Sequence, residues 1–175
     1  ASQTDDMATR VPHSHGVYMV PGFVGLGAPH WDPDARGLIC GLTLDATAAH
    51  IARAALESVA YQTLDLVSAM VQDGGGTTES IRIGGGMSAN DWCCQFLADM
   101  LQAKVERPRN VETTALGAGF LAGMATGVWE NEDTVAAEWA RGSLFEPKMD
   151  STQRRTMIAG WHQAVKRTLS TYTGG

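Results

Sequence analysis

The sequence feature that most constrains the fold is the stretch 81–90, which reads Ile-Arg-Ile-Gly-Gly-Gly-Met-Ser-Ala-Asn. The apolar alternation at its start is typical of a strand, and three glycines end that strand. Ser88 followed by Asp91 matches an acidic form of the capping box, which predicts that a helix begins near Ala89. Bare glycine backbone before a helix can present N–H groups to an anionic or planar ligand, and the helix dipole favours an anion by about 0.3–1 kcal/mol.

The same stretch is also compatible with an ordinary strand–turn–helix unit that binds nothing. It does not match the dinucleotide fingerprint G-x-G-x-x-G, because three consecutive glycines followed by Ala89 have the wrong spacing. It is not a Walker loop, since no Gly-Lys-Ser or Gly-Lys-Thr follows. These residues alone therefore leave two hypotheses open, a ligand-binding turn and a packing turn.

Composition predicts a globular protein with one hydrophobic core. The chain has 175 residues, of which 44% are hydrophobic and 18% charged, and its formal net charge is −6. No apolar run long enough for a membrane span and no signal peptide are visible, and nucleic acid is not expected as a partner of so acidic a chain. The three cysteines, Cys40, Cys93 and Cys94, form no disulfide framework. Cys93 and Cys94 are expected to be small buried apolar residues in a reducing cytoplasm.

Hydrophobic periodicity predicts strands that alternate with helices. Strands are expected at residues 17–20, 38–42, 81–83 and 105–108, and helices at residues 46–72, 89–101, 115–124, 133–139 and 151–169. Such alternation is typical of an α/β sheet with parallel strand pairs, in which ligands bind beyond the carboxyl ends of the strands. A polar loop is expected over residues 1–16 and a surface connection over residues 145–147.

Two helices carry further expectations. In the long helix 46–72, apolar spacing predicts one buried face, which leaves Glu57 at a solvated or paired position. The residues of that predicted face are Ile51, Ala55, Leu56, Val59, Thr63, Leu66, Val67 and Met70. In the helix 115–124, Gly117, Gly119 and Gly123 predict that the helix backbone packs closely against another element, since each glycine weakens an isolated helix by about 1 kcal/mol.

Two pairs of polar residues suggest metal ligands, but each has a simpler interpretation. Asp32 and Asp34 form a carboxylate pair suited to Mg²⁺, yet Asp32-Pro33 is also typical of a turn, with Arg36 pairing a nearby carboxylate. His13 and His15 have no Cys or acidic partner at ligand spacing. The sequence therefore predicts turns and loops here, and no metal site.

Several segments together resemble the FGGY family of carbohydrate kinases, which includes glycerol, xylulose and gluconate kinases. The segments that carry this likeness are residues 16–37, 37–42, 50–57, 85–90, 105–108 and 112–118. Residues 37–42 and 50–57 look like the second family signature, and residues 85–90 look like the adenosine motif. The loop Ala-Pro-His-Trp-Asp-Pro is the part most typical of glycerol kinases within the family, and the likeness covers nearly the whole chain.

The resemblance implies an α/β fold, namely a partial actin-like or ribonuclease-H-like ATPase domain with a mixed sheet flanked by helices. Family members are much longer and have two such domains, with the active site in the cleft between them. Residues 17–175 would then be the carboxyl-terminal, nucleotide-binding domain without its first strands. Residues 1–16 would be a polar leader from a missing element.

The resemblance also implies a function for the complete enzyme, the phosphorylation of glycerol to sn-glycerol 3-phosphate with ATP and Mg²⁺. The alternatives are another FGGY sugar or polyol kinase and a non-catalytic scaffold fragment. The catalytic aspartate, the glycerol site and the phosphate-gripping hairpins would belong to the missing part, so no catalytic residue is expected here. The complete enzyme is also expected to be cytoplasmic and to form a homo-oligomer. Neither nucleic acid nor a membrane is expected as a partner.

Three residues carry the implied nucleotide site for ATP or ADP. Gly86, with Gly85 beside it, looks like the glycine that packs on the adenine and ribose. Asn90 looks like the asparagine that hydrogen-bonds the adenosine, since an amide supplies both a donor and an acceptor. Gly84 stands where the family usually has aspartate, so no acidic contact is expected from that position.

Overall fold

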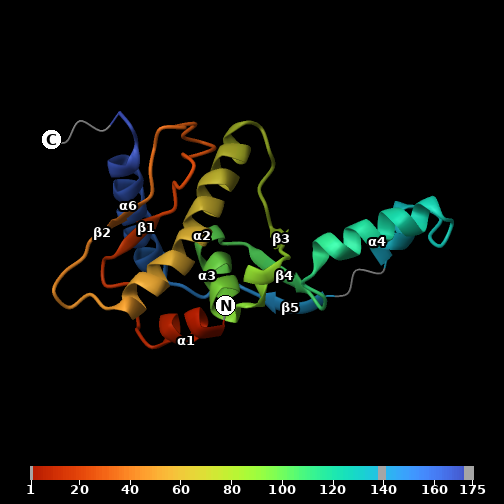
Figure 1. Ribbon diagram of the computed structural model, residues 1–175, viewed down its shortest axis with the longest axis horizontal. Coiled ribbons are helices and arrows are strands. Elements are labelled where there is room, and N and C mark those ends of the chain that lie inside the picture. The colour runs from red at the N-terminus through yellow and green to blue at the C-terminus, as the bar shows by residue number, and fades with distance from the viewer. Residues whose placement is uncertain (1, 138–140, 172–175) are drawn as a thin grey trace.

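The computed structural model describes residues 2–137 and 141–171, which form helices interspersed with short strands (Figure 1). A short 3₁₀ turn, η1, precedes the third α-helix. In chain order the elements are α1 (Ser2–Thr9), β1 (Tyr18–Val20), β2 (Leu38–Cys40), α2 (Ala48–Gln72), β3 (Ser80–Arg82), η1 (Gly86–Ala89), α3 (Asp91–Leu101), β4 (Lys104–Pro108), α4 (Thr113–Ala125), α5 (Glu132–Ala137), β5 (Arg141–Phe145) and α6 (Ser151–Thr168).

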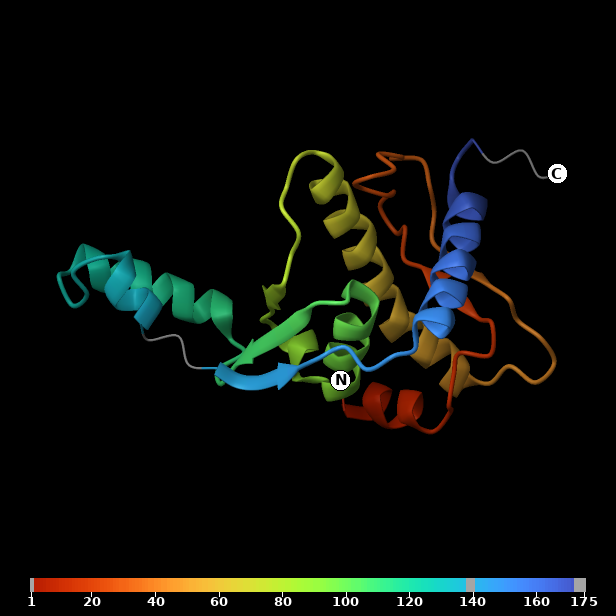
Figure 2. The same ribbon diagram turned by 180° about the vertical axis from the view of Figure 1, so that it is seen from behind.

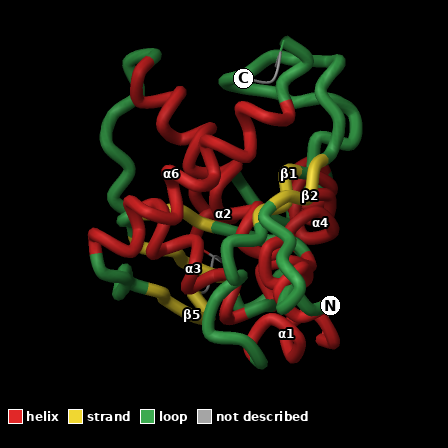
Figure 3. Tube along the Cα trace, turned by 90° about the vertical axis from the view of Figure 1, so that its left-hand side faces the viewer, coloured by secondary structure: helices red, strands yellow, loops and turns green. Residues whose placement is uncertain are grey.

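A mixed three-stranded sheet has the order β3-β4-β5. β3 and β4 are parallel, with Ile81 opposite Val105, and β5 pairs antiparallel with β4, with Phe145 opposite Val105. β1 and β2 form a separate antiparallel pair, and Figure 3 shows the strands in yellow as short segments among the helices in red. The mixed sheet flanked by helices confirms the predicted fold class.

β5 is the one strand of the described sheet that the sequence analysis missed. Residues 145–147 were expected to be a surface connection, whereas Phe145 ends a strand that pairs with β4. The strand reads Arg-Gly-Ser-Leu-Phe and has only two apolar residues, both at its end. Such a sequence lacks the alternation that marks a strand, so its pairing with β4 decides its conformation.

Aromatic side chains from three helices form the centre of the core. Tyr61 of α2 stacks on Trp161 of α6, with ring centroids 5.2 Å apart, and meets the edge of Phe96 of α3 at 5.6 Å. All three residues are at most 3% exposed. Trp161 Nε1 donates to Asp65 Oδ2 at 2.7 Å, which satisfies the indole. These contacts fix α3, and with it the chain that enters α3, against α2 and α6.

The predicted buried face of α2 is right at Leu56, which is 4% exposed, but is wrong further along the helix. Leu66 and Met70 are 45% and 58% exposed, whereas Ala54, Glu57 and Tyr61 are at most 1% exposed. The last three follow one another at the i, i+3, i+7 spacing of a helix face. The apolar pattern predicted a different face because the observed buried face contains a glutamate and a tyrosine hydroxyl.

Glu57 is tolerated in the core because Arg53 pairs with it. Arg53 Nε donates to Glu57 Oε1 at 3.1 Å, and the guanidinium lies 4.5 Å from the ring centroid of Trp92. Arg53 Nη1 also donates to the carbonyls of Ala8 and Val11 at 3.1 and 2.7 Å. One arginine therefore neutralises a buried carboxylate and joins α2 to the end of α1.

Residues 2–9 form α1, and the expected polar loop over this stretch is wrong. Ala8 is fully buried, and its carbonyl accepts the hydrogen bond from Arg53, 45 positions along the chain. The sequence of α1 has no apolar periodicity, so packing on α2 rather than local pattern stabilises it. The division of the chain at residue 16 stays a prediction.

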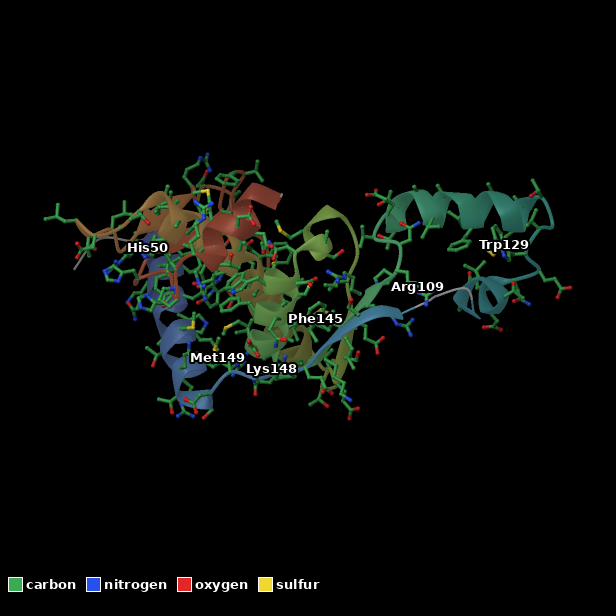
Figure 4. The ribbon with its side chains drawn as sticks, turned by 90° about the horizontal axis from the view of Figure 1, so that it is seen from below. His50, Arg109, Trp129, Phe145, Lys148 and Met149 are labelled. Carbon is green, nitrogen blue, oxygen red and sulfur yellow. The ribbon has the colours of Figure 1, made fainter. Side chains whose placement is uncertain are left out.

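α4 extends away from the body of the molecule, as Figure 2 shows. Most of its residues are exposed or only half-buried. Gly123 is the buried residue of this helix, and an added Cβ there would lie 2.1 Å from ring atoms of Trp129. Gly117 and Gly119 face open space within the described part of the chain. The predicted close packing is therefore found at one glycine of the three, next to the Trp129 side chain labelled in Figure 4.

The remaining helices agree largely with expectation. Asp150 caps α6, as its carboxylate accepts N–H bonds from Thr152 and Gln153 at 2.8 and 3.2 Å. These bonds lower the pKa of Asp150. Part of the predicted helix 133–139 is α5, and Trp139 lies outside the described residues. None of the described helices combines the length and apolar character needed to cross a membrane.

We expect Glu57→Gln to change how folding depends on pH. Burial raises the pKa of Glu57 above its ordinary value of 4.5, although the charge of Arg53 opposes this. An acid with a raised folded-state pKa stabilises the fold fully below its unfolded pKa, and this contribution is lost as pH rises through the folded pKa. The free energy of unfolding of the wild type, measured by urea titration at a series of pH values above 4.5, should therefore fall relative to that of the variant.

The attraction to Arg53 is already part of the pKa of Glu57, so its effect varies with pH in the wild type alone. Altered packing and hydrogen bonding of the glutamine shift its whole curve, so the diagnostic quantity is the difference in slope between the two curves. Parallel curves would contradict the prediction.

Candidate functional site

The glycine-rich turn lies beyond the carboxyl end of β3, beside its parallel partner β4. Ile83 N–H donates to the Glu106 carbonyl at 3.0 Å, and Gly85 N–H donates to the Val111 carbonyl at 2.7 Å. Gly85 has a φ of +84°, a conformation that favours glycine. The turn is therefore anchored at the edge of the sheet where parallel α/β folds bind their ligands.

Asn90, and not Ser88, caps α3. Asn90 Oδ1 accepts the N–H of Cys93 at 2.8 Å, and the helix begins at Asp91. Ser88 Oγ instead donates to the Gly85 carbonyl at 2.6 Å and closes η1. The predicted capping box is wrong because asparagine is an equally strong N-cap residue and the residues before it form a separate turn.

The oxygen and the nitrogen of the Asn90 side-chain amide have different roles. Its oxygen holds the start of α3, while its Nδ2 has no acceptor among the residues that the structure describes. The side chain is half-buried at the mouth of the turn. Asn90 can therefore donate a hydrogen bond to a ligand without giving up the helix cap.

Gly85 and Gly86 leave the outer face of the turn open. A Cβ added at either position would meet nothing within 4 Å. The N–H groups of Gly86 and Met87 have no acceptor in the described part of the chain. The structure thus brings the three predicted residues together as bare backbone with free donors beside an amide donor, which suits a flat or anionic ligand.

Gly84 is held against the start of α4. An added Cβ would lie 2.5 Å from Cγ2 and 2.6 Å from Oγ1 of Thr113, closer than real Cβ contacts come. Thr113 therefore fills the space that a side chain at this position would need. Sequence reasoning found the missing aspartate but not this reason, because the contact joins residues 29 positions apart.

A cavity of about 170 Å³ lies behind the turn, between α2, β3 and α3, and both buried cysteines line it. Burial raises the pKa of the Cys93 thiol to about 12 and raises the pKa of Cys94 as well. Both thiols are thus protonated and unreactive near neutral pH. The predicted role of these cysteines as small buried apolar residues is confirmed.

Asp32 stabilises a turn, as one of its two interpretations predicted. Its Oδ1 accepts the Asp34 N–H at 3.0 Å, and its Oδ2 accepts the Ser170 N–H at 2.7 Å. These bonds, led by the one from Ser170, lower the pKa of Asp32. Arg36 donates to two backbone carbonyls instead of the expected carboxylate.

Asp99 also has a structural role. Its Oδ1 accepts the N–H groups of Lys148 and Met149, which lie between β5 and α6 in Figure 4, at 2.6 and 3.1 Å. His13 and His15 stack with ring centroids 5.7 Å apart in the loop after α1. Within residues 2–137 and 141–171, no group of three or more His, Cys, Asp or Glu side chains is placed to hold a metal ion.

Comparison with known families decides where this chain belongs. The sequence model described as the carboxyl-terminal domain of the FGGY family of carbohydrate kinases matches residues 2–126. The chain belongs to the FGGY family. The family resemblance deduced from the sequence is thereby confirmed.

The curated relatives of this FGGY chain include many glycerol kinases. It is 68% identical to the glycerol kinase of Gluconobacter oxydans over 170 residues. This alignment covers 97% of this chain and 33% of the relative. It is 52% identical to glycerol kinase 1 of Clostridium tetani over 168 residues, in an alignment that covers 96% of this chain and 34% of the relative. The chain therefore spans about a third of the length of the curated relatives that it matches.

Solved structures confirm the actin-like, ribonuclease-H-like ATPase fold of the FGGY kinases. The crystal structure of Plasmodium falciparum glycerol kinase with ADP matches with a TM-score of 0.83 and 35% identity, over 98% of this chain and 34% of that one. The gluconate kinase of Lactobacillus acidophilus matches with a TM-score of 0.73 over 94% of this chain and 33% of that one. At 22% identity, the second match shows the fold alone.

Alanine should be tolerated at Gly86 and not at Gly84. Gly84→Ala forces a contact with Thr113 and should lower the free energy of unfolding by about 1–3 kcal/mol. Gly86→Ala is the matched control, with an expected change within about 0.5 kcal/mol, because its Cβ enters open space. Urea unfolding measures both, and Thr113→Ala should recover part of the loss at Gly84. Equal effects at the two glycines would refute this account of the turn.

Proposed function

We propose that the protein to which this chain belongs transfers a phosphoryl group from ATP to glycerol and forms sn-glycerol 3-phosphate. This chain supplies the wall on which the adenosine lies. The observation that carries the proposal is the open turn of Gly85 and Gly86 with the free amide donor of Asn90 beside it. It occurs in a chain that is up to 68% identical to glycerol kinases.

The choice of glycerol as acceptor is supported by the pattern of likeness. Eight curated glycerol kinases are 47% to 68% identical over nearly the whole chain, and the solved Plasmodium falciparum glycerol kinase is 35% identical. The gluconate and xylulose kinases of Lactobacillus acidophilus are each 22% identical. Binding of ADP or ATP is supported by the ADP in the solved Plasmodium falciparum glycerol kinase.

The described residues can perform the positioning part of this reaction. In phosphoryl transfer the protein chiefly positions the reactants and neutralises charge. The bare backbone of Gly85 and Gly86 admits a purine or ribose at close range. The N–H groups of Gly86 and Met87, with Nδ2 of Asn90, donate hydrogen bonds to it. These contacts would hold the nucleoside and leave its phosphates to the rest of the enzyme.

The chemical step itself is assigned to parts of the enzyme outside this chain. Asp32 and Asp99 use their carboxylates to hold backbone, and Asp91 pairs with Arg107 at 2.6 Å. None of them is left as a base for a glycerol hydroxyl. Mg²⁺ would arrive with ATP and be held by its phosphates and by residues beyond this domain. We further propose a cytoplasmic homo-oligomer, with neither nucleic acid nor membrane as a partner, as suits the net charge of −6.

We expect Asn90→Ser to weaken ADP binding without weakening α3. Serine keeps an oxygen that can cap the helix, but it removes the amide donor. The Kd for ADP should rise by roughly 2- to 12-fold, which corresponds to one hydrogen bond. Isothermal titration of the complete enzyme measures this, and its unfolding midpoint is measured in parallel.

Asn131→Ser is the matched control for this experiment. Asn131 Oδ1 accepts the Thr134 N–H at 3.0 Å at the start of α5, so the same change is made at another helix start, away from the turn. The Kd for ADP should be unchanged in this control. An unchanged Kd in Asn90→Ser as well would remove Asn90 from the nucleotide site and favour the scaffold hypothesis.

The 175-residue chain alone should not phosphorylate glycerol. A coupled assay with ATP, Mg²⁺ and glycerol should detect no glycerol 3-phosphate from this chain, because the described residues offer no free carboxylate base at the turn. The complete enzyme serves as the positive control. Formation of glycerol 3-phosphate by the isolated chain would contradict the proposal that the catalytic residues lie outside this chain.

A further inference from the structure

Arg107 of β4 is joined to the glycine turn by a planar fork of hydrogen bonds. Its Nη1 donates to the Ser88 carbonyl at 2.9 Å and to Asp91 Oδ1 at 2.6 Å. Its Nη2 donates to Ser143 Oγ of β5 at 3.0 Å. The guanidinium carbon lies 5.4 Å from the ring centroid of Phe145, which Figure 4 labels on β5.

These contacts fall on both sides of Asn90. Ser88 lies two residues before it and Asp91 immediately after it, so Arg107 holds the short segment that aims the Asn90 amide. The Arg107 side chain is only 16% exposed, although Asp91 is 74% exposed. Charge-assisted bonds from such a sheltered guanidinium are stronger and geometrically stricter than those of a solvated surface pair.

The fork is also anchored on its other side. Ser143 belongs to β5, which pairs antiparallel with β4, and Phe145 of the same strand packs on the core. The turn is therefore tied to two strands of the sheet through one side chain. Lysine carries the same charge, but its single nitrogen cannot reproduce a planar fork that spans Ser88, Asp91 and Ser143.

We propose that Arg107 is a positioning residue for the nucleotide, one that sets the orientation of Asn90 without touching the ligand. The inference rests on the proposed function of the turn and adds to it a residue on a neighbouring strand. A small displacement of a binding group weakens every contact that the group makes. Nucleotide affinity should therefore depend on the geometry of Arg107 and not merely on its charge.

Steady-state kinetics of the complete enzyme with Arg107→Lys test this proposal. The KM for ATP should rise severalfold, while kcat and the KM for glycerol stay within about twofold, as for a loss of uniform nucleotide binding. A merely structural role would lower the amount of active enzyme, and so kcat, and would leave the KM for ATP unchanged. That result would overturn the proposal.

Two further variants sharpen the experiment. Arg155→Lys makes the same change at an exposed arginine of α6 whose Nη2 donates to Thr152 Oγ1 at 3.1 Å, and it should leave the KM for ATP unaltered. Ser143→Ala removes one arm of the fork and should raise the KM for ATP in the same direction, but less. It keeps the proposal testable if Arg107→Lys fails to fold. An unchanged KM in the serine variant, with Arg107→Lys unfolded, would overturn the proposal.

A double-mutant cycle separates this inference from the proposed function. If Arg107 acts through Asn90, adding Arg107→Lys to Asn90→Ser should raise the KM for ATP by less than about twofold further. Fully multiplicative effects would overturn the inference while leaving the nucleotide site intact. If Asn90→Ser changes neither the KM for ATP nor the Kd for ADP, the proposed function of the turn fails, and the inference fails with it.

Discussion

The packing of Tyr61 against Phe96 and Trp161 is the contact on which the rest of the structure depends. It joins α2, α3 and α6 through rings that are almost completely buried, and burial of large aromatic surfaces is the strongest source of stability that a core of this size has. Because Phe96 packs α3 against Tyr61 of α2, the first turn of α3 has a defined position relative to β3 and β4. The glycine turn then has two fixed ends, a strand and a helix, and only a few residues between them.

Polar groups complete this arrangement where apolar packing cannot. The Arg53–Glu57 pair allows a carboxylate to lie in the core and secures α1, which has no apolar face of its own. Asp32 ties the long loop after β1 to the end of α6 through Ser170. In both cases one charged side chain bonds several backbone groups, at least one of them in a distant segment, so the loops are held without regular pairing.

Much of the fold could be predicted from the sequence because its central signals are local. The parallel pair of β3 and β4, the glycine turn and α3 follow from apolar periodicity and turn chemistry over short stretches. The site residues Gly85, Gly86 and Asn90 came from resemblance, and the structure adds that they lie together on an open face. α1, β5 and most of the buried face of α2 could not be predicted, because distant partners decide each of them. The roles of Thr113 and Arg107 at the turn were missed for the same reason.

The division of the Asn90 amide has a consequence for how the turn responds to a ligand. A carboxamide that donates through its nitrogen becomes more polarised, and its oxygen becomes a better acceptor. A nucleoside that accepts a hydrogen bond from Nδ2 would thus strengthen the bond that Oδ1 accepts from the Cys93 N–H at the start of α3. Occupancy and helix order would be coupled through the three atoms Nδ2, Cγ and Oδ1 of one side chain, so that a bound nucleoside would reinforce the start of the helix on which it rests.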